Sequence, residues 1–313
     1  MDRVAEPGVT PLSTSARLST LKPVVTAFFD KRTCSVQYVV SDPETKRCAI
    51  IDPVLDFEPK SGATATHSAD TILAYIQSEG LVPDWVLDTH PHADHFSAAG
   101  YLKDKTGARI GTGQKVVEVQ RLWKDLYNLP DSFRTDGCQW DQLFGDGERF
   151  SLGHLTCEVF FSPGHTLAST TYVVSDAAFI HDTLFMPDGG TARCDFPGGS
   201  AKALWTTIQR ILVLPNDTRL FTGHDYMPGG REPRWESTVP QQRAENIHLR
   251  KANTEAEFIS LRESRDRILP MPKLILSALQ LNIAGGRLPE PESNGRRYLK
   301  IPLDALQHPI WDE

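Results

Sequence analysis

Residues 89–95 read Thr-His-Pro-His-Ala-Asp-His and place four side chains that can bind a metal ion within six positions. The stretch follows a short apolar run at 85–87, which predicts a strand, and precedes residues 96–105, which predict a helix. A loop between a strand and a helix can present several ligands to one pocket. Histidine and aspartate supply nitrogen and oxygen donors that suit zinc, iron and manganese. Asp94 or His95 alone could cap the following helix, but three histidines at this density favour a metal site.

Three later side chains of the same chemical types each follow a predicted strand. His165 lies in a turn that contains glycine, just after the strand predicted at 155–161, and Asp182 and His224 closely follow two later strands. Taken singly, each could be an ordinary turn or surface residue. Because all three stand at strand ends, we expect them to meet the 90–95 loop at one edge of the fold.

The remaining chain alternates strand and helix patterns. Strands are predicted at 24–30, 34–41, 47–53, 85–87, 155–161, 170–174, 177–180 and 219–222. Helices are predicted at 68–79, 96–105, 201–212, 241–251 and 254–268. We expect Ser68 to cap the first helix and Thr254 to cap the last, with Glu257 at the capping-box position. This order predicts an α/β fold in which helices flank two sheets.

The composition of the chain argues against some classes of partner and indicates in which compartment the protein works. The 313 residues include 33 Lys and Arg against 40 Asp and Glu, and this net charge of −7 argues against a nucleic-acid partner. No apolar run reaches the roughly 20 residues that a membrane-spanning helix needs, and residues 1–20 lack the pattern of a secretory signal. The five cysteines show no paired spacing, which indicates reduced thiols and a cytoplasmic location.

The HxHxDH pattern at 90–95, followed in order by His165, Asp182 and His224, resembles the metallo-β-lactamase superfamily over about residues 24–227. The resemblance implies an αββα sandwich with its metal site at one edge and a short helical C-terminal extension. It does not fix the reaction, because members hydrolyse thioesters, lactones, β-lactams or phosphodiesters, or oxidise persulfides.

The same resemblance suggests how the chain is divided. We expect residues 1–20 to form a flexible N-terminal arm and residues 21–240 to form the catalytic domain. Residues 241–313 would be a helical segment and tail packed on that domain.

Residues beyond the ligand set resemble the persulfide dioxygenase and glyoxalase II-like group most closely. Asp-Thr-Leu-Phe at 182–185 matches the glyoxalase II type, and the motifs at 190–196 (Gly-Thr-Ala-Arg-Cys-Asp-Phe) and 223–226 (Gly-His-Asp-Tyr) match the dioxygenase type. By this resemblance, the substrate pocket is lined by Arg193, Asp195 and Tyr226. Tyr226 and Asp94 are the residues expected to take part in catalysis.

The dioxygenase resemblance implies one iron(II) per chain, bound by His90, His165 and Asp182. Four further side chains would orient these ligands or bind a second metal: His92, Asp94, His95 and His224. The substrate would be glutathione persulfide, oxidised with O₂ and water to sulfite and glutathione, and the protein could be a homodimer. Alternatively, the same seven residues could bind two zinc ions in a hydrolase of glutathione thioesters or of another small acyl substrate.

Three features depart from the pattern of these families. His181 occupies the position before Asp182, where these families usually have glycine. The segment 186–191 is longer than in the best-known dioxygenases, and the charged helices predicted within 241–268 have no clear counterpart.

Overall fold

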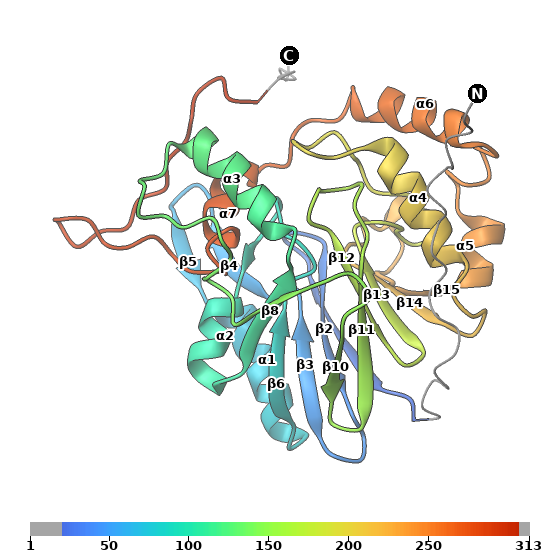
Figure 1. Ribbon diagram of the computed structural model, residues 1–313, viewed down its shortest axis with the longest axis horizontal. Coiled ribbons are helices and arrows are strands. Elements are labelled where there is room, and N and C mark those ends of the chain that lie inside the picture. The colour runs from blue at the N-terminus through green and yellow to red at the C-terminus, as the bar shows by residue number, and fades with distance from the viewer. Residues whose placement is uncertain (1–20, 307–313) are drawn as a thin grey trace, which may run out of the picture.

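The structure is a computed structural model that describes residues 21–306, so the predicted N-terminal arm and residues 307–313 lie outside the described range. Two six-stranded sheets pack face to face (Figure 1). The first sheet has the order β1 (Val24–Asp30), β2 (Ser35–Ser41), β3 (Arg47–Ile51), β6 (Val82–Leu87), β8 (Arg109–Gly113) and β9 (Gln142–Phe144). The second has the order β10 (Arg149–Leu152), β11 (Leu155–Phe161), β12 (Thr170–Val174), β13 (Ala177–His181), β14 (Arg219–Thr222) and β15 (Glu236–Thr238).

A smaller sheet and the helices complete the layers. The small sheet has the order β5 (Ala63–Ala65), β4 (Val54–Glu58) and β7 (Phe96–Ser97). The α-helices are α1 (His67–Ser78), α2 (Ala99–Thr106), α3 (Val116–Tyr127), α4 (Ala201–Leu212), α5 (Val239–Glu245), α6 (Glu255–Asp266) and α7 (Ile275–Asn282), and a short 3₁₀ turn, η1, spans Pro228–Gly230. No helix within residues 21–306 is both long and apolar enough to cross a membrane.

The alternation of side chains along β2 explains the layering. Val36, Tyr38 and Val40 pack between the two sheets, whereas Val39 points to the other face and packs with α1 and α2. On the far side, α4 buries Leu204 and Ile208 against the second sheet. The predicted αββα sandwich is confirmed, with helices on both outer faces (Figure 1).

The start of α1 differs from the prediction. Thr66 is the N-cap residue, and its side chain makes no capping hydrogen bond. The Ser68 hydroxyl instead donates to Asp56 Oδ1 over 2.6 Å. Asp56 is a buried carboxylate on β4 that needs donors, and Arg32 also pairs with it. The prediction that Ser68 caps the helix was therefore wrong, because its hydroxyl is hydrogen-bonded to Asp56 instead.

Two further predicted helices have different bounds. Residues 96–97 form strand β7, which pairs with β4, and the Phe96 ring stacks on Phe57 at 4.2 Å, so α2 begins only at Ala99. The helix predicted at 241–251 is α5, which begins at Val239 and ends at Glu245. The predicted capping box of α6 is confirmed, with Thr254 accepting from the Glu257 backbone. Several short strands, together with α3 and α7, had no sequence prediction.

Candidate metal centre

The ligand-type side chains meet where strands of both large sheets end. The loop after β6 carries residues 90–95, while His165, Asp182 and His224 follow β11, β13 and β14. Ligand atoms of His90, His165 and Asp182 all lie within 4.8 Å of one another. A second group of the same kind contains Asp94, Asp182 and His224, and a third contains His92, Asp94 and His95. All seven predicted side chains therefore come together, and Asp182 is common to two groups.

His90 is held with one ring nitrogen free. The Thr89 hydroxyl donates to Asp52 Oδ2 over 2.8 Å, so its oxygen is left to accept from His90 Nδ1 at 3.0 Å. The other nitrogen, Nε2, is buried without a hydrogen-bond partner in the described chain. Burial lowers the pKa of His90 well below its usual value, so the ring is neutral and Nε2 carries a lone pair.

His165, which follows another strand, also has one ring nitrogen hydrogen-bonded and the other free. Its Nδ1 lies 2.8 Å from the carbonyl oxygen of Arg193, which can only accept, so Nδ1 carries the proton. Burial lowers the pKa of His165, and its Nε2 lone pair faces Asp182 Oδ2 at 3.5 Å. A lone pair facing a carboxylate is unfavourable unless a cation lies between them. The donor set of His90, His165 and Asp182 therefore fits a metal ion.

His224 and Asp94 satisfy each other's hydrogen bonds. His224 Nδ1 donates to Asp182 Oδ1 over 2.6 Å, and its Nε2 donates to Asp94 Oδ2 over 2.8 Å. Burial opposes a charge on this ring, but the carboxylate of Asp182 and that of Asp94 raise the pKa of His224 well above its usual value. Both nitrogens of the ring are therefore paired with carboxylates, and Oδ2 is the Asp182 oxygen that faces His165.

His92 and His95 each leave one nitrogen free. His92 Nε2 donates to Asp52 Oδ1 over 2.9 Å, and His95 Nδ1 donates to Asp94 Oδ2 over 2.8 Å. Their other nitrogens, His92 Nδ1 and His95 Nε2, are buried and lack a partner within residues 21–306. Burial favours the neutral form, but Asp52 raises the pKa of His92 to about 9. A proton or a second metal can therefore occupy this side of the centre.

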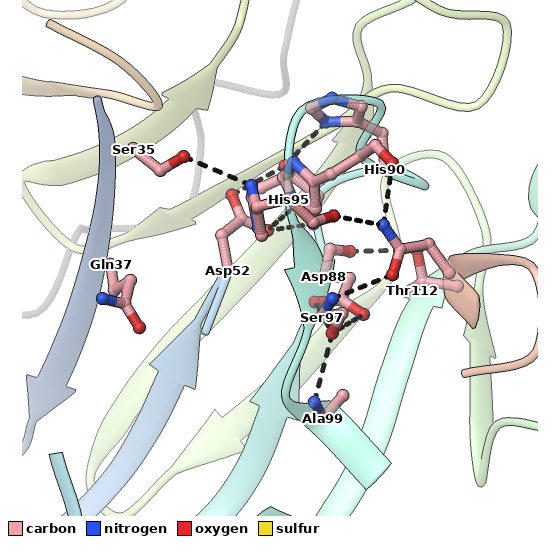
Figure 2. Close-up of polar contacts among 12 residues, drawn as sticks. Ser35, Gln37, Asp52, Asp88, His90, His95, Ser97, Ala99 and Thr112 are labelled. Atoms are coloured by element: carbon pink, nitrogen blue, oxygen red, sulfur yellow. Dashed lines mark hydrogen bonds and ion pairs between the residues drawn. The ribbon is translucent and has the colours of Figure 1, made fainter. Parts of the chain in front are cut away.

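A layer of polar groups beneath the loop supports the histidines. Figure 2 shows His90, His95 and Asp52 above the carboxylate of Asp88, to which the Ser97 hydroxyl donates over 2.8 and 2.9 Å. Burial raises the pKa of Asp88 to about 7. Sequence reasoning missed Asp52, although its place at the end of the strand predicted at 47–53 is the same signal that identified Asp182.

Other supporting groups gave no sequence signal. Ser35 lies within 3.2 Å of His95 Nδ1 (Figure 2) and also within hydrogen-bond distance of His224. Asn282, at the end of α7, donates from Nδ2 to the carbonyl oxygens of His92 and His95 over 2.7 and 2.8 Å. Because 187 or more residues separate Asn282 from this loop, only the folded chain reveals the contact.

His181 lies beside the centre and belongs to none of the ligand groups in the described chain. Its backbone has a φ of 41°, in the left-handed region that favours glycine. His181 Nε2 lies within hydrogen-bond distance of the Ser162 hydroxyl, at 2.7 Å, and the His181 ring lies 5.5 Å from that of His90. His181 therefore packs against a triad histidine.

The three predicted substrate residues line the same edge. Arg193 donates to both oxygens of Asp195 over 2.7 and 2.8 Å and to the Pro270 carbonyl over 2.5 Å. Its guanidinium lies over the Phe196 ring, which in turn contacts His165. Tyr226 stacks on His224 with ring centroids 5.6 Å apart and is 58% exposed. Tyr226 thus stands between the centre and solvent, while Arg193 is already paired.

Similar proteins carry names of both hydrolases and a dioxygenase. The chain is 67% identical over 295 residues to a beta-lactamase hydrolase-like protein of Agrobacterium fabrum, covering 94% of this chain and 68% of that protein. It is 44% identical to glyoxylase B2 of Dictyostelium discoideum, covering 91% of this chain and 99% of the relative. It is 29% identical to the mitochondrial persulfide dioxygenase ETHE1 of Mus musculus, covering 82% and 87%.

Comparison with solved structures and with family models agrees with the fold. The crystal structure of ETHE1 from Myxococcus xanthus matches with a TM-score of 0.67 and 28% identity, covering 84% of this chain and all of that chain. The sequence model of the metallo-beta-lactamase superfamily matches residues 33–224, the span that contains every side chain of the metal centre. This chain belongs to the metallo-beta-lactamase superfamily.

Proposed function

We propose that this chain is an iron(II)-dependent persulfide dioxygenase that oxidises glutathione persulfide with O₂ and water to sulfite and glutathione. The observation that carries the proposal is that three of the ligand-type side chains have free donor atoms directed at one point, whereas two others are hydrogen-bonded to each other. His90 and His165 direct Nε2 lone pairs toward one side of Asp182, whereas Asp94 and His224 are engaged with each other. Two histidines and one carboxylate on one face leave open positions on iron for a thiolate and O₂.

Two of the comparisons support the dioxygenase. The relative in Mus musculus is named a persulfide dioxygenase, and the ETHE1 structure from Myxococcus xanthus covers 84% of this chain. In the proposed reaction the persulfide sulfur takes up two oxygen atoms from O₂ and one from water, and the sulfur–sulfur bond breaks to release the thiol. When bound, iron(II) supplies the electrons that make O₂ reactive.

In this proposal the protein mainly positions the reactants. The Arg193 carbonyl and the Thr89 hydroxyl fix which nitrogens of His165 and His90 are free. Tyr226, exposed above His224, would donate its hydroxyl hydrogen to the anionic sulfur, and Asp94 would keep His224 charged. Arg193 would bind a glutathione carboxylate with donors that it shares with Asp195.

A second candidate is a dinuclear zinc hydrolase of glutathione thioesters or of another small acyl substrate. The observation that favours it is the pair of buried free nitrogens, His92 Nδ1 and His95 Nε2, beside an Asp182 shared between two ligand groups. Such a site could hold two metals. The names of the Agrobacterium and Dictyostelium relatives, a hydrolase-like protein and a glyoxylase, fit a hydrolase.

The two candidates are separated by substrate and by metal. The protein should be purified without oxygen, its metal content measured, and O₂ uptake followed after addition of glutathione persulfide. The dioxygenase proposal expects iron, one ion per chain, and O₂ uptake with release of sulfite. Zinc alone in the protein, with no O₂ uptake after iron loading and with turnover of S-lactoylglutathione, would establish the hydrolase instead.

We also propose a cytoplasmic location, from the unpaired spacing of the cysteines, and a homodimeric state, from the family resemblance. All five cysteines are free thiols, which agrees with a reducing compartment.

A further inference from the structure

Two of the departures expected in the sequence analysis concern segments that lie against each other in the structure. One is the segment that runs from Phe185 through the longer 186–191 loop to Cys194, and the other is the C-terminal region 242–266. Three carbonyls of the first segment accept hydrogen bonds from the second: Phe185 from Gln242 Nε2 at 2.8 Å, Pro187 from the Ile247 backbone at 2.9 Å, and Gly190 from Asn246 Nδ2 at 2.9 Å. The C-terminal region therefore binds the 186–191 loop through hydrogen bonds to its backbone.

The contacts continue to the residues on either side of Arg193. His248 Nδ1 accepts from the Thr191 backbone N–H over 2.9 Å, and Arg262 Nη1 donates to the Thr191 carbonyl over 3.1 Å. Asp266 Oδ2 accepts from the Cys194 backbone N–H over 3.0 Å. The Arg193 carbonyl, which belongs to the same peptide group as the anchored Cys194 N–H, accepts from His165 Nδ1.

We infer that Arg262 and Asp266 are positioning residues for the metal centre, which act by fixing the Arg193 carbonyl and, through it, the orientation of the His165 ring. This inference rests on the proposed role of His165 as a metal ligand. It holds for a dioxygenase and for a hydrolase alike, because His165 serves in both.

The burial of this ion pair suits a positioning role. Arg262 is 1% exposed and Asp266 is 4% exposed, and they pair with each other one helical turn apart on α6. A buried ion pair adds little net stability, but each charge strictly requires its partners. Here Arg262 Nη1 donates to the Thr191 carbonyl and Asp266 Oδ2 accepts from the Cys194 N–H, while Arg262 Nε has no hydrogen-bond partner in the described chain. The pair therefore ties α6 to the backbone before and after Arg193.

The two segments approach each other so closely that the backbone at their contact has little conformational freedom. Gly190 has a φ of +80°, and a Cβ at this position would lie 2.4 Å from His248 Nδ1. Glycine is therefore required where the loop meets the C-terminal region. Groups that orient a metal-bound histidine typically change metal affinity 10-fold to 100-fold when they are removed.

The test is the affinity and the visible spectrum of cobalt(II) bound to the full-length protein. Asp266→Ala removes the acceptor of the Cys194 N–H, and Asp266→Asn keeps one oxygen that can replace it. Phe258→Leu is the matched control, since Phe258 is buried on the same helix but packs against Trp205 of α4. Affinity is measured by competition with a chromophoric chelator, and unfolding temperatures are recorded for every variant.

We expect Asp266→Ala to weaken cobalt binding about 10-fold and to shift the cobalt absorption bands. Asp266→Asn should fall between this variant and the wild type, while Phe258→Leu should lower the unfolding temperature without changing affinity or spectrum. If Asp266→Ala does not fold, the comparison of Asp266→Asn with Phe258→Leu decides.

Two outcomes would overturn the inference: wild-type affinity and spectrum in the folded Asp266 variants, or an equal loss of affinity in Phe258→Leu. Failure of the wild type to bind cobalt would overturn the metal site and this inference together. Absence of O₂ uptake with persulfide would contradict the proposed dioxygenase activity but leave the positioning role standing.

Discussion

The two sides of the metal centre are built from the chain in different ways. On one side, the 90–95 loop presents four ligand-type side chains, and its neighbours Asp52 and Thr89 fix two of the rings. On the other side, His165 is oriented by the Arg193 carbonyl, which the region 242–266 holds in place. Four of the seven ligand-type side chains thus lie close together in the sequence. The groups that orient His165 come from segments far from it in the sequence.

The largest effect is expected on the ligand-rich side. His90→Ala should remove bound metal and reduce turnover to background, because it deletes one of the three free donor atoms of the triad. Elemental analysis of the purified variant measures the loss. His154→Ala, at an exposed surface histidine, is the control that should retain full occupancy. Normal metal content in His90→Ala would show that the ion binds elsewhere.

A pH-dependent effect is expected on the side held by distant segments. Burial, followed by the nearby charge of Arg262, lowers the pKa of His248 from the usual histidine value of 6.5 to about 3. Below about pH 6.5, therefore, His248 binds a proton in the unfolded chain but stays neutral in the folded chain. The stability that this neutral ring contributes is complete above that pH and is lost progressively as the pH falls toward 3.

The variant His248→Asn tests this pH dependence, since Asn can accept the Thr191 N–H but does not titrate. Between pH 6.5 and 4.5 the wild type should lose about 2–3 kcal/mol more unfolding free energy than the variant, at about 1.4 kcal/mol per pH unit. Urea denaturation at several pH values gives the comparison. Parallel pH profiles for the two proteins would contradict the buried neutral state of His248.

Arg193 lies on the side of the centre that contains His165, and its side chain has a separate predicted role. Arg193→Ala keeps the backbone carbonyl that holds His165 but removes the guanidinium proposed to bind a glutathione carboxylate. We expect KM for glutathione persulfide to rise about 10-fold with little change in metal content, because a charged hydrogen bond contributes about 1.5–3 kcal/mol. An unchanged KM would reject the carboxylate role.

The smallest effect is expected at Cys194. Burial raises the pKa of this thiol to about 12, so the sulfur stays protonated, and it donates to Asp266 at 3.3 Å. Cys194→Ala retains the backbone N–H that anchors the segment. Metal affinity should therefore stay within twofold of the wild type, and the unfolding temperature should fall slightly. A variant stripped of metal would show that the ligand set lacks a thiolate.

The same contrast explains how much of the molecule could be predicted from sequence. The 90–95 pattern and the strand-end positions of His165, Asp182 and His224 predicted that the ligands gather, and the family resemblance that these residues carry implied the αββα fold. The start of α2 was mispredicted because Phe96 pairs as a strand and stacks on Phe57, a tertiary contact that outweighs local propensity.

Supporting groups were less predictable still. Asn282 and Asp266 act from α7 and α6 on segments far away in sequence, and neither carries a local pattern of its own. Asp52 could have been found, since it ends a strand at the same edge as the ligands. A ligand residue can thus be recognised from the sequence pattern around it. The groups that orient its side chain cannot, because their contacts exist only in the folded chain.

The central claim is that one iron ion binds between His90, His165 and Asp182. Anomalous X-ray diffraction at the iron edge, from crystals of protein purified without oxygen and loaded with iron, tests it most directly. The account predicts a single iron peak at bonding distance from His90 Nε2, His165 Nε2 and Asp182 Oδ2. Two metal peaks of equal height, or a peak remote from His165, would contradict it.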